Sequence, residues 1–162
     1  MYRRYTETGS LGGATGFTLG SGVMASTAKT LLMISSTAAI RPYIYDFTFG
    51  TIGTPSDSVV TVVLTRFSTA TATLGAATTP SPLDTSDAVA ITTALGSQTV
   101  EGTAGVTLFQ VGLNVRATYR WVAAPGGELI CAAGAGLNAS IRLAAYSPAY
   151  VLDATTTIYH AE

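Results

Sequence analysis

The order of apolar and polar residues predicts an all-β chain from residue 29 onward. Within residues 43–49, aromatic side chains recur at every second position, a spacing that places them on one face of a strand. The aromatic residues of this face are Tyr43, Tyr45, Phe47 and Phe49. A strand face this apolar has to be covered by a second sheet or by a neighbouring subunit.

Further short runs of apolar or alternating residues predict the other strands, and no long segment has helical periodicity. These runs are residues 30–36, 59–66, 106–111, 117–123, 128–133, 137–145 and 154–160. Residues 59–66 are nearly all apolar, as in a strand buried on both faces, and we expect them to form a hairpin with residues 43–49. A Pro-Gly-Gly turn at residues 125–127 predicts a second hairpin between the runs on either side of it.

Residues 69–105 are the least regular part of the chain, with Pro80, Pro82 and an Asp-rich turn at residues 83–87. We expect a surface excursion there, with one or two short strands that include residues 98–101 and with room for a helical turn near Ser86. About eight strands at this spacing predict two packed antiparallel sheets, a jelly-roll-like β-sandwich.

The first 28 residues differ from the sandwich domain, which we place at residues 29–162. Six glycines interrupt residues 9–22, yet apolar side chains are scattered among them. We therefore expect residues 1–28 to be an extended N-terminal arm that becomes ordered on a partner. The residues expected to contact that partner are Tyr2, Arg3, Arg4, Tyr5, Leu11, Phe17 and Leu19.

Composition favours an assembly subunit. Charged residues make up 10% of the chain, against about 25% in soluble domains, which indicates a surface that partly faces protein. The longest apolar runs, such as residues 59–64, are far shorter than the ~20 residues of a membrane-spanning helix, so we expect no membrane contact. A net charge of −1 gives no general attraction to nucleic acid, so we expect no direct nucleic-acid binding.

Candidate catalytic and metal-ligating residues are scarce. The single histidine, His160, lies beside Glu162 in what we expect to be a solvated terminus, too remote to serve as the base for a nucleophilic serine. Zinc requires several converging ligands, so we expect no metal site. With so few candidate acids, bases and nucleophiles, we also expect no catalytic residue, no cofactor and no enzymatic activity. The single cysteine, Cys131, is expected to be a small buried side chain.

Two further groups of residues allow two interpretations each. Asp84 and Asp87 are expected to cap backbone N–H groups in their turn, with weak calcium binding as the alternative. Trp121 is expected in the core, with Arg116 and Arg120 at its rim and paired with acids. The alternative for Trp121 is a flat platform that binds carbohydrate.

Residues 41–51 (RPYIYDFTFGT) and 113–129 (LNVRATYRWVAAPGGEL) resemble small virion structural proteins of tailed bacteriophages, of the kind that decorate or cement the head. The similarity spans roughly residues 41 to 130. It implies a β-sandwich made in the host cytoplasm that sits on the outer surface of the capsid. It also implies a homotrimer that clamps neighbouring major capsid proteins. A receptor- or glycan-binding module, such as the head of a fibre, is the alternative.

Overall fold

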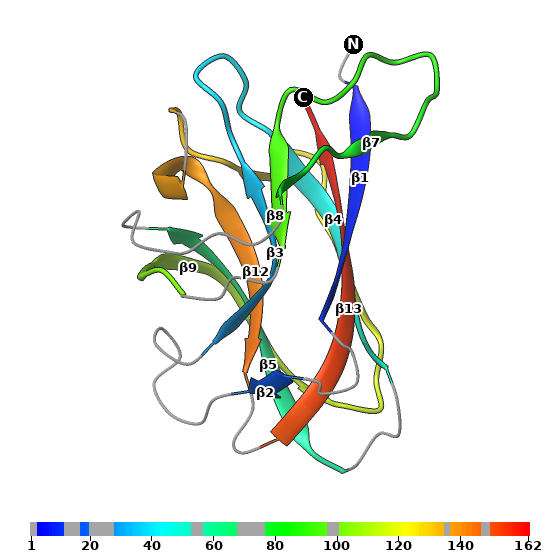
Figure 1. The fold of residues 1–162 in the computed structure, drawn as a ribbon, viewed down its shortest axis with the longest axis vertical. Helices are drawn as coiled ribbons and strands as arrows, with labels where there is room; N and C mark the ends of the chain where they lie inside the picture. Colours follow the sequence, from blue (N-terminus) through cyan, green and yellow to red (C-terminus); the bar gives the residue numbers. More distant parts are fainter. Residues whose placement is uncertain are drawn as a thin grey trace.

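The computed structural model describes residues 3–11, 17–19, 28–52, 57–67, 77–96, 101–134, 137–146 and 150–162. These residues form two antiparallel sheets that pack face to face, which confirms the predicted β-sandwich (Figure 1). The seven-stranded sheet contains β1 (Arg4–Leu11), β2 (Phe17–Leu19), β4 (Tyr43–Ile52), β7 (Ser81–Pro82), β10 (Tyr119–Val122), β11 (Leu129–Ile130) and β13 (Tyr150–Ala161). The six-stranded sheet contains β3 (Lys29–Ser35), β5 (Val59–Phe67), β6 (Ala77–Thr78), β8 (Thr93–Gly96), β9 (Ala104–Asn114) and β12 (Ile141–Tyr146), preceded by the 3-10 turn η1 (Leu137–Ala139).

Eight of these strands have jelly-roll connectivity. The main path of the first sheet runs β10-β4-β13-β1, and that of the second runs β3-β12-β5-β9. Along the chain these strands alternate between the sheets, except that β5 and β9 follow one another in the second sheet and pair there. The first strand pairs with the last, as in two Greek keys wound together. The inner faces meet in one core, in which Phe47, Phe49 and Ile158 lie opposite residues of the second sheet such as Val62 and Leu143.

The predicted hairpins are both wrong. β5 does not pair with β4 but lies in the other sheet, between β12 and β9. β10 and β11 do not pair with each other but lie one after the other along the same edge of β4. The two apolar strands β4 and β5 therefore lie in different sheets and face the same core, instead of pairing side by side. Alternation of apolar and polar residues alone does not determine which of these arrangements forms.

A β-bulge in β4 changes the faces of its aromatic residues. In the β4·β13 ladder, Asp46 lies opposite Tyr159 and Ile44 lies opposite His160, so Tyr45 is an extra residue. Phe47 and Phe49 point into the core as expected, but Tyr45 and Tyr43 lie on the outer face of the sheet. The expectation of four aromatic residues on one face is therefore wrong, because the bulge shifts the alternation by one residue.

The first strand belongs to the sandwich. Along its whole length β1 pairs with β13, and the Tyr5 side chain is only 1% exposed. Gly9 packs so closely on β3 that a Cβ atom there would lie 2.7 Å from the Leu31 carbonyl oxygen. For residues 4–11, the expectation of an arm is corrected to a core strand, because the backbone groups along this edge of β13 pair with β1 and the Tyr5 side chain is buried. Residues 12–16 and 20–27 lie outside the described residues.

The irregular segment between β5 and β9 is a surface excursion with short strands, as expected. Its strand β7 pairs with β1, while β6 pairs with β8 and β8 with β3, so the excursion joins both sheets at one end of the sandwich (Figure 1). Residues 83–87 form a turn without a helix, closed by a hydrogen bond from Asp87 N to Asp84 O of 3.0 Å. Residues 97–100, most of the expected strand at 98–101, lie outside the described residues.

A buried ion pair anchors the end of this excursion. Arg142 of β12 is 0% exposed, and its Nη1 donates to Oε2 of Glu101 at 3.0 Å. The Arg142 Nε donates to Thr65 Oγ1 at 2.9 Å, and the guanidinium lies 5.2 Å from the centre of the Phe67 ring. Glu101 also accepts a hydrogen bond of 2.8 Å from the backbone N–H of Thr30. One carboxylate therefore ties residue 101 to β3 and β12.

Replacing Glu101 with alanine is expected to lower the free energy of unfolding by about 3–5 kcal/mol, because the Arg142 cation then stays buried without a counterion. The double variant Glu101→Leu/Arg142→Met should cost less than Glu101→Ala alone, since no charge remains buried. Urea unfolding measures both, and Glu7→Ala, a partly exposed carboxylate in β1, is the matched control. A double variant less stable than Glu101→Ala would contradict the assigned role of the pair.

Candidate binding groove

A groove opens on the outer face of the seven-stranded sheet, where two irregularities of the backbone face each other. On β4, the bulge pushes Tyr45 outward. Along the neighbouring edge, residues 123–128 leave the sheet between β10 and β11 in a turn closed by Gly127 N to Ala124 O at 2.8 Å. Gly126 in this turn has a φ of 80°, a conformation that favours glycine. The predicted Pro-Gly-Gly turn is therefore present, but it interrupts the edge of the sheet between β10 and β11 instead of closing a hairpin.

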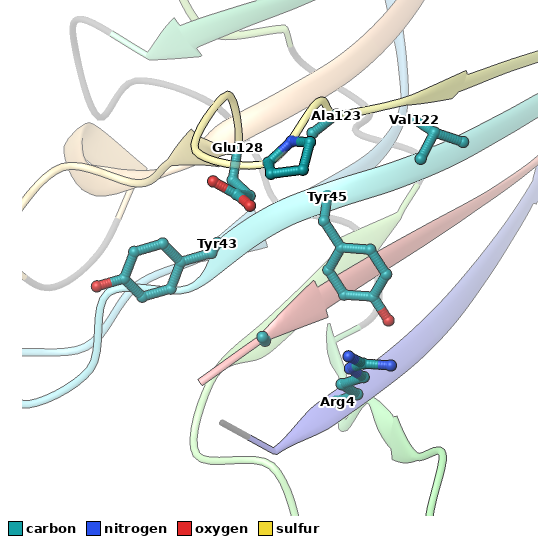
Figure 2. A pocket seen from close by; sticks show the side chains of 8 residues that line it. Arg4, Tyr43, Tyr45, Val122, Ala123 and Glu128 are labelled. Carbon is teal, nitrogen blue, oxygen red and sulfur yellow. The ribbon is translucent and has the colours of Figure 1, made fainter. Parts of the chain in front are cut away.

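The groove has a volume of about 480 Å³ (Figure 2). Its lining residues are Arg4, Tyr43, Tyr45, Val122, Ala123, Pro125, Glu128 and Ala161. They come from β1, β4, β13 and the segment from β10 to β11, so four parts of the chain build it. Figure 2 shows the ring of Tyr45 reaching from β4 toward Arg4, while Glu128 and Tyr43 lie toward the other end.

The polar groups of the groove are suited to binding. The Arg4 guanidinium lies 6.0 Å from the centre of the Tyr45 ring, a cation–π contact. Burial raises the pKa of the Tyr45 phenol, and Arg4 partly offsets this effect, so the phenol stays protonated near neutral pH. Within the described residues Arg4 forms no ion pair, so its N–H groups remain available as donors. At the other end, Glu128 Oε1 accepts a hydrogen bond of 3.3 Å from Gly126 N and offers further acceptor capacity.

The carboxylate of Asp46, next to the groove, is already paired with an arginine. The Asp46 carboxylate accepts hydrogen bonds from both Nε and Nη2 of Arg120, the latter at 2.5 Å. The Asp46 side chain is 6% exposed. Tyr159, opposite Asp46 in the ladder, lies 6.4 Å from Tyr45 between ring centres and extends the aromatic surface along β13. The groove therefore offers phenol rings, one cation and one accessible carboxylate, a set that can recognise a ligand.

The single histidine lies in the interior, so the expectation of a solvated terminus is wrong. His160 is 0% exposed and stacks on Tyr5 with ring centres 5.5 Å apart. Its Nε2 lies 3.0 Å from Thr92 Oγ1 and 3.7 Å from Glu162 Oε1. In a catalytic triad the acid bonds Nδ1 and the nucleophile faces Nε2, whereas here both groups share Nε2 and Nδ1 has no hydrogen-bond partner among the described residues. We call this cluster of His160, Thr92 and Glu162 the clamp.

The clamp fixes the end of the excursion to β13. Glu162 Oε2 and Oε1 accept the backbone N–H groups of Ile91 and Thr92 at 3.0 and 2.9 Å, and Thr92 Oγ1 also donates to Oε1. Burial alone would raise the pKa of the Glu162 carboxyl, but its hydrogen bonds with His160, Thr92 and Ile91 lower it to about 2.

The predicted partner-binding residues are dispersed. Arg4 lines the groove, whereas Arg3 is exposed and lies 3.8 Å from Asp87. Tyr5 is a core residue, which corrects its place among the contact residues. Leu11, Phe17 and Leu19 stand opposite Ala154, Leu152 and Tyr150 of β13, and Tyr2 lies outside the described residues. Sequence reasoning missed the groove residues Pro125, Glu128, Tyr43 and Tyr45, because alternation placed both tyrosines on the core face and nothing in the sequence relates them to the turn at residues 125–128.

The remaining candidates have structural roles. Trp121 stacks on Phe47 at 5.5 Å and also contacts Phe109, so the core interpretation is confirmed. Its rim arginines pair with acids, Arg116 with Asp57 at 2.8 Å and Arg120 with Asp46.

Cys131 is buried as expected, and desolvation raises the pKa of its thiol to about 12. Asp84 Oδ1 accepts Ser86 N at 2.9 Å, which confirms the capping role for Asp84, whereas the Asp87 carboxylate lies 3.8 Å from Arg3. Among the described residues, no three metal-ligating side chains come together.

Comparison of the chain with protein-family models, with curated proteins and with solved structures finds no match. In the part of the chain that the structure describes, no helix is long and apolar enough to cross a membrane.

Glu162→Gln is expected to lower the free energy of unfolding by about 1.5–3 kcal/mol at neutral pH, because charge-assisted hydrogen bonds are lost. The folded pKa of about 2 lies below the ordinary value of 4.5, so the carboxylate stabilises the fold above pH 4.5 and loses this effect as the pH falls toward 2. Chemical unfolding across this range should show the parent and the variant converging. A difference that stays constant from neutral pH to about pH 2 would contradict this role.

Proposed function

We propose that the protein is a non-enzymatic structural subunit of a bacteriophage virion, which decorates and cements the outer surface of the head. One observation carries this proposal. The two stretches that resemble phage decoration proteins, residues 41–51 and 113–129, lie side by side as β4 and the β10–β11 edge. Together they supply six of the eight side chains that line the groove. The resemblance and the candidate contact site thus coincide on one surface.

The use of charge supports the same role. Four ion pairs of the described residues join distant parts of the fold: Arg3–Asp87, Arg116–Asp57, Arg120–Asp46 and Arg142–Glu101. These pairs use ionisable side chains as ties within the sandwich.

In the proposed mechanism, the groove receives a segment of the major capsid protein on the outer shell. Tyr43 and Tyr45 provide apolar contact area, and Arg4 and Glu128 fix the orientation of the segment through hydrogen bonds. Three copies in a homotrimer would bind three capsid proteins at once, and this multivalency stabilises the shell although each contact is modest. The protein is made in the host cytoplasm and works on the virion.

Tyr45→Ala is expected to weaken binding to particles that lack the protein by about tenfold or more, because a central tyrosine often dominates an interface. Co-sedimentation with such particles measures the affinity, and electron microscopy locates the bound subunits. Val89→Ala, an exposed apolar truncation on the excursion, is the matched control and should bind as the parent does. Unchanged binding of Tyr45→Ala, or subunits found only on the tail, would refute the proposal.

A second function, glycan or receptor binding by a fibre module, is favoured by the same tyrosines. Two phenol rings with a donor at one end and an acceptor at the other also suit a saccharide, whose apolar faces stack on rings while its hydroxyls form hydrogen bonds. Jelly rolls occur in both capsid and lectin domains. Saccharide binding that is lost in Tyr43→Ala, with particle binding unchanged, would favour this function over the first.

A further inference from the structure

We propose that two copies of the protein join through β9, which pairs with its own copy antiparallel about a two-fold axis at Gly112. Among the described strands, β9 ends the order of the six-stranded sheet, so one of its edges has no strand beside it. It spans 11 residues and contains neither a charged residue nor proline, the usual means of blocking an open edge.

The ladder between β9 and β5 shows which backbone groups are free. Val115 N donates to Ser58 O at 3.0 Å, in register with the pairing of Asn114 with Val59. Because hydrogen-bonded pairs alternate in an antiparallel ladder, the odd-numbered residues from 109 to 115 bond to β5. The N–H and C=O groups of Gln110, Gly112 and Asn114 therefore point away from the sheet.

The regular part of this edge is short and centred on Gly112. A register shift leaves Leu108 as an extra residue, so the ladder is continuous only from Phe109 to Asn114. Because a β-bulge bends its strand and can end regular pairing, we expect a second strand to pair with β9 only along residues 109–114. An antiparallel copy aligned on Gly112 would place the two Gly112 residues opposite each other and each Gln110 opposite an Asn114.

The side chains of this segment are self-complementary in that register. Gln110, Gly112 and Asn114 are exposed, while Val111 and Leu113 pack against the core. Asn114 Oδ1 already accepts Arg116 N at 2.9 Å, so its NH₂ group is left to donate to the Gln110 amide oxygen of the other copy. On the inner face, each Val111 would lie opposite a Leu113. A second copy of this strand thus satisfies both the backbone and the side chains, which an arbitrary peptide does not.

This contact rests on the proposed assembly role in one respect, since two-fold axes relate neighbouring trimers on an icosahedral shell. It is measured on the isolated protein, so it can fail while binding to the shell succeeds. Gly112 is a safe position to change, because a Cβ atom there meets no atom within 4 Å and the residue is not among the glycines with positive φ.

Gly112→Glu and Gly112→Lys each place like charges opposite one another across the axis, which destabilises a strand pair. Sedimentation over a range of concentrations should show the parent associating in a two-fold step. Each variant should raise the dissociation constant of that step at least tenfold, and an equimolar mixture of the two variants should restore it. Val106→Glu, an exposed position on β9 beyond the bulge, should behave as the parent does.

Hydrogen exchange gives an independent readout. The amides of Gln110, Gly112 and Asn114 should exchange more slowly in concentrated than in dilute protein. The Gly112→Glu substitution should abolish that difference at Gln110 and Asn114. A parent protein without a two-fold step, equal association of parent and Gly112→Glu, or no recovery in the mixture would each overturn the proposal.

Discussion

The antiparallel pairing of β13 with β4 is the interaction on which the rest of the structure depends. It joins nine residue pairs in the middle of the larger sheet, and β13 also carries β1 on its other side. The inner face of this ladder forms much of the core, with Phe47, Phe49 and Ile158. Its single bulge turns Tyr45 outward and so creates the groove on the outer face. Core and candidate site are therefore two sides of one ladder.

Alternation along the chain predicted the strands well, because it depends only on which face of each strand is buried. Residues 43–49, 59–66 and 154–160 all form strands in the structure. It could not predict which strands pair, since β4 and β5 bury similar apolar faces whether they lie side by side or across the core. The bulge at Tyr45 was also hidden, because the extra residue is defined only by its partners on β13.

The candidate site was predicted in part, through Arg4 alone. Tyr5 was expected to contact a partner because it precedes a glycine-rich segment, and His160 was expected to be solvated because it lies near the end of the sequence. They stack on one another in the interior, so each buries the other. This contact joins positions that no local pattern relates, and the same is true of the groove, which combines side chains from β1, β4, β13 and the segment from β10 to β11.

The pairing of β1 with β13 sets an order of events for the biosynthesis of this protein. The two strands lie side by side, and the chain ends are near each other at one end of the sandwich (Figure 1). On the ribosome, residues 4–11 must wait as an unpaired strand until residues 154–161 emerge. Because contacts this distant in sequence slow folding, the nascent chain exposes the core face of β1, including Tyr5, until the last strand closes the sheet.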